Sequence, residues 1–143
     1  MATQRTAEVV WKGNLLEGAG TIVTATSGAL PPLAVSWASR AEEPAGKTSP
    51  EELIAAAHAA CFAMALSHGL AESGYRAERL ETSATVTFQP GEGIKSSELT
   101  VRGTVPGMGA AEFLEQAEAA KVGCPVSQAL TGVEITLTAE LAG

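Results

Sequence analysis

The sequence predicts an α+β fold whose elements follow the order βββ-α-ββ-α-β. Three observations support this order: strand-like alternation in the first third, one long apolar helical segment in the middle, and a hairpin pattern followed by a second helix and a last alternating strand. The chain has 143 residues, of which 45% are hydrophobic. It therefore fits a single domain over residues 1–143 with a core of its own.

The first third of the chain predicts three strands, at residues 5–12, 20–26 and 33–39. The first strand is centred on a Val-Val-Trp run and is followed by a Gly-Asn turn signal. The second alternates threonines with apolar residues, and the third is expected to end near Arg40. Residues 41–49 then form a polar loop that contains proline and glycine.

A long helix is predicted from Pro50 to about Glu72. Ser49 is a good N-cap, proline suits the first helical position, and Glu51 and Glu52 favour the positive end of the helix dipole. The middle of this helix is apolar nearly all round and rich in alanine. We therefore expect it to be buried on most sides, with room for another helix to approach closely.

The second half of the chain predicts a hairpin, two helices and a closing strand. The predicted strands are residues 80–89, 94–105 and 133–141, and a Pro-Gly-Glu-Gly turn joins the first two. An amphipathic helix is expected at residues 110–120 and a short one at 126–130.

Charge and composition exclude several classes of function. The formal net charge is −7 and no Lys/Arg cluster is present, which disfavours nucleic-acid binding. The sequence contains neither a run of about 18 strongly apolar residues nor an apolar secretory segment at its start, so we expect a cytoplasmic protein with no membrane partner. Its two cysteines are far apart and form no CxxC motif, and so we expect no metal site and no cofactor.

The two cysteines leave three interpretations open: buried free thiols, one lone nucleophile, or a redox pair. Position alone favours an inert, buried Cys61, because burial raises the pKa of a thiol unless a positive neighbour opposes it. Cys124 stands between Gly123 and Pro125, at a predicted helix start that favours a thiolate. A small capping residue is an equally good interpretation of Cys124, and sequence spacing does not show that the thiols meet.

Three further residues have both an ordinary and a functional interpretation. Arg40 and Glu51 need no explanation as surface residues, and Glu51 also suits the first turn of a helix. His58 precedes Cys61 by three residues, so it could face the same side of the helix and assist the thiol. A packed, hydrogen-bonded His58 is the favoured interpretation.

Two long motifs resemble those of the OsmC/Ohr family of organic hydroperoxide reductases. Residues 48–62 are similar to the first cysteine motif of that family and residues 121–130 to the second, and with residues 11–13 and the final strand the similarity covers essentially the whole chain. The resemblance implies an intertwined homodimer with long central helices between sheets. It also implies a thiol-dependent peroxidase for oxidative or osmotic stress defence, in which Cys61 becomes a sulfenic acid and Cys124 resolves it as a disulfide.

The resemblance also assigns an arginine and a glutamate to the site. Glu51 matches the family glutamate that holds an arginine near the thiolate, and Arg40 is similar to the arginine of the OsmC branch, since the Gly-Gly-Arg-type turn of the Ohr branch is missing. If Glu51 and Cys61 share one unbroken helix, they are ~15 Å apart along it. Either the helix breaks between them or Glu51 serves the Cys61 of a partner chain, and the second case predicts a two-fold homodimer.

Substrate and reductant follow from the same resemblance. Phe62, Met64 and Trp37 are the candidate substrate-binding residues, because apolar surroundings would favour alkyl or lipid hydroperoxides. The expected reductant is a dithiol, such as one on a lipoyl-bearing protein. The main alternative is a non-enzymatic stress or ligand-binding module on the same fold; a redox sensor is disfavoured because the acidic chain offers no output surface such as a DNA-binding helix.

Overall fold

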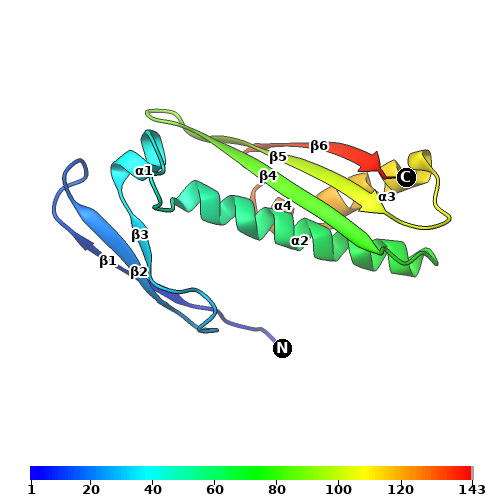
Figure 1. Ribbon diagram of the computed structural model, residues 1–143, viewed down its shortest axis with the longest axis horizontal. Helices are drawn as coiled ribbons and strands as arrows, with labels where there is room; N and C mark the ends of the chain where they lie inside the picture. The colour runs from blue at the N-terminus through cyan, green and yellow to red at the C-terminus, as the bar shows by residue number, and fades with distance from the viewer. Residues whose placement is uncertain (143) are drawn as a thin grey trace. The chain divides into compact units, whose positions relative to one another are not determined.

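A computed structural model describes residues 1–142 as six strands and four helices (Figure 1). The strands are β1 (Ala7–Lys12), β2 (Ala19–Ala25), β3 (Leu33–Val35), β4 (Arg79–Gln89), β5 (Gly93–Thr104) and β6 (Glu134–Leu141). The helices are α1 (Trp37–Ala41), α2 (Pro50–Glu72), α3 (Ala110–Gly123) and α4 (Pro125–Ala129). The α+β class predicted from the sequence is confirmed. The chain divides into two compact units: the N-terminal unit, Met1–Leu53, and the C-terminal unit, which begins at Ile54.

The N-terminal unit contains an antiparallel sheet in the order β1-β2-β3. Its core is sparse: Ile22 is buried, whereas every residue of β1 is exposed. A three-stranded sheet of this size has little apolar surface with which to stabilise itself. The N-terminal unit therefore presents much of its apolar surface to its surroundings.

The predicted strand at residues 33–39 is wrong beyond Val35, because the chain turns there into the short helix α1. Ser36 is the N-cap of α1, and its Oγ accepts a hydrogen bond of 3.0 Å from the backbone N–H of Ser39. The Ser39 hydroxyl in turn accepts from the Ser36 N–H, which completes a capping box. Arg40 consequently lies in the last turn of a helix and not at the end of a strand.

Helix α2 begins where the sequence predicted. The backbone N–H of Glu52 donates a 3.1 Å hydrogen bond to Ser49 Oγ, and Pro50 occupies the first helical position. Glu51 and Glu52 both lie in the first turn, at the positive end of the dipole. The helix then continues without interruption to Glu72.

The C-terminal unit is built on a three-stranded sheet in the order β4-β5-β6 (Figure 1). Strands β4 and β5 form an antiparallel hairpin, whereas β6 pairs with β5 in parallel. A parallel neighbour requires a crossover, and α3 and α4 supply it. Residues of β5 alternate in burial, so one face of the sheet is solvated and the other is covered by helices.

The core of the C-terminal unit lies between that sheet face and the helices α2 and α3. Its buried residues come from these three elements and from the segment before α3: Phe62, Leu66, Leu70, Leu99, Val101, Val105, Met108, Phe113, Ala117 and Ala120. Gly103 belongs to the same inward row of β5, where the ring of Phe113 takes the place that a side chain would occupy.

The expectation that α2 is buried on most sides is wrong for this single chain. One face carries Phe62, Leu66 and Leu70 into the core, but Met64 and Ser67 are exposed on the other. Among the described residues, α2 is also long and apolar enough to cross a membrane by length and composition alone, because its alanines count as apolar. A core helix of a soluble protein passes the same test, and the buried face of α2 is that of a core helix.

Candidate functional site

The structure brings the two cysteines together in the C-terminal unit. Cys61 lies on α2 and is half-buried, and its side chain is in hydrogen-bonding contact with that of Cys124, which is fully buried. Both thiols are free. The sequence alone had left open whether they meet, and their contact favours the redox pair over two unrelated buried thiols.

Cys124 is held at the junction of two helices. Its backbone N–H donates to the carbonyl of Ala120 at 2.9 Å, which closes α3, and its own carbonyl accepts from Gln128 at 3.0 Å, which opens α4. Pro125 follows at the first position of α4, as the Gly-Cys-Pro motif predicted. Because the backbone on both sides belongs to a helix, the Cys124 sulfur has a fixed direction.

The two thiols differ in acidity within one chain. Burial raises the pKa of Cys61, and the hydrogen bond with Cys124 raises it further against a smaller opposing effect from the Val126 N–H. Burial also acts to raise the pKa of Cys124, but interactions with Cys61, with the hydroxyl and N–H of Ser127, and with the Val126 N–H outweigh it and lower that pKa. The pair therefore favours the thiolate on Cys124, and Cys61 needs a further positive neighbour to become the nucleophile.

His58 is packed and hydrogen-bonded, as the sequence favoured. It has no exposed surface, and both of its ring nitrogens are engaged. Nδ1 lies 2.6 Å from the Ser97 hydroxyl on β5, and Nε2 lies 2.8 Å from the Ser127 hydroxyl on α4. Burial lowers the pKa of His58, so the imidazole is neutral near pH 7.

Arg40 and Glu51 form an ion pair within the N-terminal unit. The Arg40 Nε donates to both carboxylate oxygens of Glu51, at 3.0 and 3.1 Å, and Nη2 donates to Oε2 at 2.9 Å. Glu51 is buried, whereas about a third of the Arg40 side chain remains accessible. The bidentate contact fixes the plane of the guanidinium.

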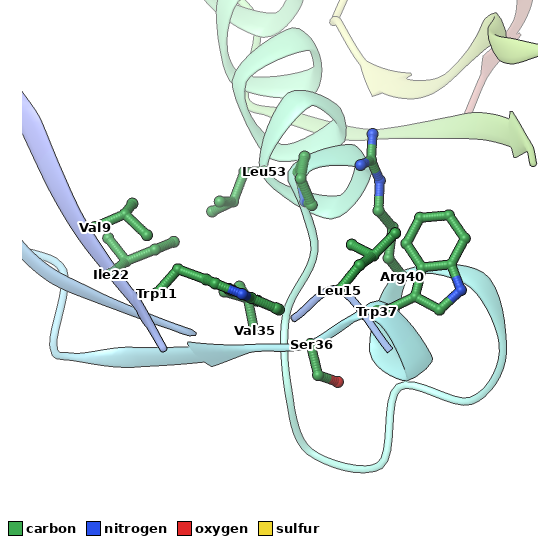
Figure 2. Close-up of a pocket in the computed structure, with 10 residues that line it drawn as sticks. Val9, Trp11, Leu15, Ile22, Val35, Ser36, Trp37, Arg40 and Leu53 are labelled. Atoms are coloured by element: carbon green, nitrogen blue, oxygen red, sulfur yellow. The ribbon is translucent and has the colours of Figure 1, made fainter. Parts of the chain in front are cut away.

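An apolar pocket adjoins this ion pair. Trp37 and Arg40 of α1 lie with side chains of β1, β2 and β3 around a cavity of about 290 Å³. Figure 2 shows how these side chains are arranged. Its lining residues are Val9, Trp11, Leu15, Ile22, Val35, Ser36, Trp37, Arg40, Pro50 and Leu53. The arrangement can hold an alkyl chain against apolar walls with one cationic group at its edge.

The residues proposed from the sequence thus fall into two groups. Cys61 and Cys124 meet in the C-terminal unit, and Arg40, Glu51 and Trp37 meet in the N-terminal unit. Phe62 is fully buried in the core and does not reach a surface where a substrate could bind, whereas Met64 is 73% exposed.

Sequence reasoning missed Ser97, Ser127 and the strand residues of the pocket. Ser127 stands three residues after Cys124 in the second cysteine motif, a spacing that places it next to a capping residue. Ser97 occupies an inward position in the row that continues with Leu99 and Val101. A polar residue in such an apolar row was a usable signal of a buried hydrogen bond.

Comparison with known proteins gives a consistent result over nearly the whole chain. The family model of OsmC-like proteins matches residues 43–138. The peroxiredoxin OsmC of Escherichia coli K12 is 40% identical over 144 positions, which cover 99% of each chain.

Solved structures agree with this match. A crystal structure of an organic hydroperoxide resistance protein of Bacillus subtilis is 28% identical, with a TM-score of 0.66 over 96% of this chain and 98% of that one. An OsmC-like protein of Mycoplasma pneumoniae has a TM-score of 0.74 over the full length of both chains, and at 16% identity that likeness concerns the fold alone.

Proposed function

Because this chain belongs to the OsmC-like family, we propose that it is a thiol-dependent peroxidase that reduces organic hydroperoxides to alcohols. The observation that carries the proposal is the contact between Cys61 and Cys124. A reactive thiol with a second thiol in contact can be oxidised and then return to the reduced state through a disulfide. The names of the relatives, a peroxiredoxin and a hydroperoxide resistance protein, support the same activity.

The first step uses Cys61 as the nucleophile. Its thiolate sulfur attacks the terminal oxygen of the hydroperoxide, the O–O bond breaks, and the electron pair leaves with the alkoxide, which takes up a proton to become the alcohol. Cys61 is thereby oxidised to a sulfenic acid.

The second step uses Cys124, whose thiolate attacks the Cys61 sulfur. The S–O bond breaks, hydroxide leaves and is protonated to water, and a disulfide joins the two residues. An external dithiol, such as that of a lipoyl-bearing protein, then reduces the disulfide and is itself oxidised.

Arg40 is the proposed source of positive charge for Cys61, whose pKa is raised by burial and by the hydrogen bond with Cys124. An arginine cannot lose its charge, so it stabilises the attacking thiolate and then the departing alkoxide. Glu51 holds the guanidinium in place through the bidentate contact. The apolar pocket beside Arg40, with Trp37 in its wall, suits the alkyl part of the substrate, and the exposed Met64 is a further candidate contact.

The cation comes from a second copy of the chain. Helix α2 is unbroken from Pro50 to Glu72, so the ten residues between Glu51 and Cys61 correspond to about 15 Å along its axis. Of the two alternatives drawn from the sequence, the unbroken helix supports the second, in which the Arg40–Glu51 pair serves the partner's thiol in a homodimer. Sedimentation equilibrium should give a dimer at working concentration; a fully active monomer contradicts this part of the proposal.

The experiment that tests the activity is a stopped-flow reaction of the reduced protein with cumene hydroperoxide, followed by intact mass. We expect rapid consumption of one equivalent and the loss of two hydrogens. Cys61→Ser should abolish consumption, whereas Cys124→Ser should leave a sulfenic acid that dimedone traps. Both thiols free after exposure to the hydroperoxide would overturn the proposal.

A non-enzymatic ligand-binding module on the same fold is the second candidate. Two observations favour it: the apolar pocket lies against an ion pair in the N-terminal unit, and the pKa of Cys61 is raised within one chain. In that case a fatty acid should bind with the same affinity to the wild type and to Cys61→Ser, while neither thiol reacts with hydroperoxide.

For the proposed peroxidase, we expect a cytoplasmic role in stress defence, without a nucleic-acid or membrane partner.

A further inference from the structure

A buried chain of hydrogen-bonding groups connects β5 with the second thiol. It begins at Ser97 on β5, passes through the imidazole of His58 on α2, and reaches Ser127 on α4, with ring-to-hydroxyl distances of 2.6 and 2.8 Å. Ser127 neighbours the Cys124 sulfur, and its hydroxyl and N–H both act on that thiol. His58, Ser97, Ser127 and Cys124 are all buried, so water does not compete for these contacts.

When Cys124 is a thiolate, the number of available protons fixes the direction of donation along the hydrogen bonds from Ser97 through His58 to Ser127. A serine hydroxyl has one proton, so if Ser127 donates it to the sulfur, its oxygen must accept from His58 Nε2. The neutral imidazole then carries its proton on Nε2 and accepts from the Ser97 hydroxyl at Nδ1. Every group is satisfied, and the Ser127 proton points at the sulfur.

The thiol form of Cys124 does not need this donor. A neutral thiol is only a weak hydrogen-bond acceptor, so a donor beside it contributes little while Cys124 keeps its proton. A hydrogen bond to a charged acceptor is roughly twice as strong as one between neutral groups. The contribution of the Ser127 hydroxyl therefore appears mainly when Cys124 loses its proton.

We propose that His58 is a positioning residue for the second thiol: through its Nε2–H it orients the Ser127 hydroxyl toward Cys124, and it thereby prepares Cys124 to attack the oxidised Cys61. This inference rests on the proposed function for its place in the reaction. The chemistry is the disulfide-forming step written above, in which His58 neither gains nor loses a proton. Burial lowers the pKa of His58, which keeps the imidazole neutral and preserves the one tautomer that can donate to Ser127.

The role of His58 differs from direct assistance to Cys61. The two residues are one turn apart on α2, but both ring nitrogens of His58 are already engaged by serines. No contact of His58 with Cys61 contributes to the pKa of that thiol, whereas Ser127 contributes to the pKa of Cys124. The imidazole therefore acts on Cys124 through Ser127.

The test measures the pKa of Cys124 directly, in a Cys61→Ser background that leaves one thiol to titrate. Thiolate absorbance near 240 nm is followed against pH for the parent, Ser127→Ala and His58→Leu. We expect each substitution to raise the pKa of Cys124 by about one unit, which corresponds to the loss of one hydrogen bond to a charged group. His58→Gln, whose amide keeps an N–H at a similar reach, should restore at least half of that shift.

A double variant separates positioning from general loosening of the structure. Because His58 and Ser127 act through one hydroxyl, His58→Leu combined with Ser127→Ala should shift the pKa no further than Ser127→Ala alone. Ser97→Ala is the matched control, since it removes a buried hydroxyl from the other side of the same ring without touching the sulfur region. Equal shifts in Ser97→Ala and Ser127→Ala, or additive shifts in the double variant, would overturn the proposal.

The reaction itself gives the second readout, with both cysteines present. After one equivalent of cumene hydroperoxide, Ser127→Ala and His58→Leu should form the disulfide about tenfold more slowly, so that more Cys61 is trapped by dimedone. An unchanged pKa of Cys124 in these variants refutes the role of His58 whether or not peroxide reacts. A shifted pKa in a protein that does not react with hydroperoxide would instead refute the proposed function and leave the positioning role standing.

Discussion

The two units of this chain differ in how far they bury their apolar side chains. In the C-terminal unit, α2, β5 and α3 enclose a core in which Phe62, Leu66 and Phe113 are almost fully buried. In the N-terminal unit, eight large apolar residues are exposed among the described residues, against three in the C-terminal unit. The eight are Met1, Val9, Val10, Trp11, Leu15, Leu16, Val23 and Leu30.

This difference shows which unit buries its apolar side chains within a single chain and which unit leaves them exposed. A polar solvated sheet face and a closed core make the C-terminal unit self-sufficient as a scaffold, and the thiols are fixed within it. Exposed apolar side chains that gather on one sheet are typical of an interaction surface. In the proposed homodimer, such a surface would be covered and Arg40 would lie near the thiol of the other copy.

The largest expected effect is in the C-terminal core. Phe62→Ala should lower the free energy of unfolding by about 3–5 kcal/mol, because it leaves a cavity beneath α2. Val10→Ala, on an exposed strand of the N-terminal unit, should change it by less than about 0.5 kcal/mol. Urea unfolding followed by circular dichroism measures both. Similar losses in the two variants would mean that the N-terminal sheet is as tightly packed as the C-terminal one.

The ion pair of the N-terminal unit should matter more for the reaction rate than for whether the chain folds. Arg40→Ala should reduce the second-order rate with cumene hydroperoxide by about 100-fold, the typical effect of removing a group that stabilises developing charge. The variant should still fold, but its melting temperature should be lower, because the buried Glu51 carboxylate loses its partner. Arg40→Lys is the matched control and should recover only part of the rate, since lysine lacks the bidentate fork. An unchanged rate in Arg40→Ala defeats the assignment of Arg40.

A pH effect should distinguish the units, since both histidines of the chain, His58 and His68, lie in the C-terminal one. The pKa of His58 is lowered in the folded state, so below about pH 6.5 the unfolded chain binds a proton that the folded chain does not. Stability is therefore complete above the unfolded pKa and falls as the pH decreases, by up to about 1.4 kcal/mol per unit, until the folded pKa is reached.

The His58 contribution is the difference between the wild type and His58→Gln, measured by urea unfolding at several pH values between 7 and 5. The glutamine variant should lack this part of the pH dependence. His68→Gln is the control, because His68 is exposed on the same helix. If the wild type and His58→Gln lose stability in parallel, the imidazole is not held neutral.

The smallest expected effect is at the junction of the units, at the start of α2. Ser49→Ala removes the acceptor of the Glu52 N–H and should cost about 1 kcal/mol. Ser67→Ala, on an exposed position of the same helix, should cost less. Thermal unfolding compares the two, and an equal effect would mean that Ser49 does not function as a cap.

The sequence predicted those elements whose signals are local. The start of α2 was predicted from Ser49 and Pro50, and the hairpin from its turn residues. The strand predicted to continue through Ser39 was wrong because the capping box there pairs two serines, a weaker signal than serine with glutamate. Helix α2 was predicted to be buried all round because its composition does not show which neighbour covers each face.

The sequence predicted which residues belong to the candidate site, but it did not predict the contacts between them. Cys61, Cys124, Arg40 and Glu51 were identified by resemblance, but the contact between the thiols depends on a crossover that no local pattern describes. The partners of His58 lie 39 and 69 residues away. The sequence therefore predicted that His58 is hydrogen-bonded but did not identify its partners. The pocket is likewise assembled from three strands, and α1 had not been foreseen.

The place of Cys124 in the crossover has a consequence for the lifetime of the protein. A disulfide to Cys61 would close a loop of about 60 residues, which restricts the unfolded chain and stabilises the folded one by about 4 kcal/mol in the chain-entropy description. The oxidised form would then withstand heat and proteases that clear the reduced form. When reductant is scarce, the oxidised molecules would therefore be inactive but long-lived. They would regain activity once a dithiol reduces the disulfide.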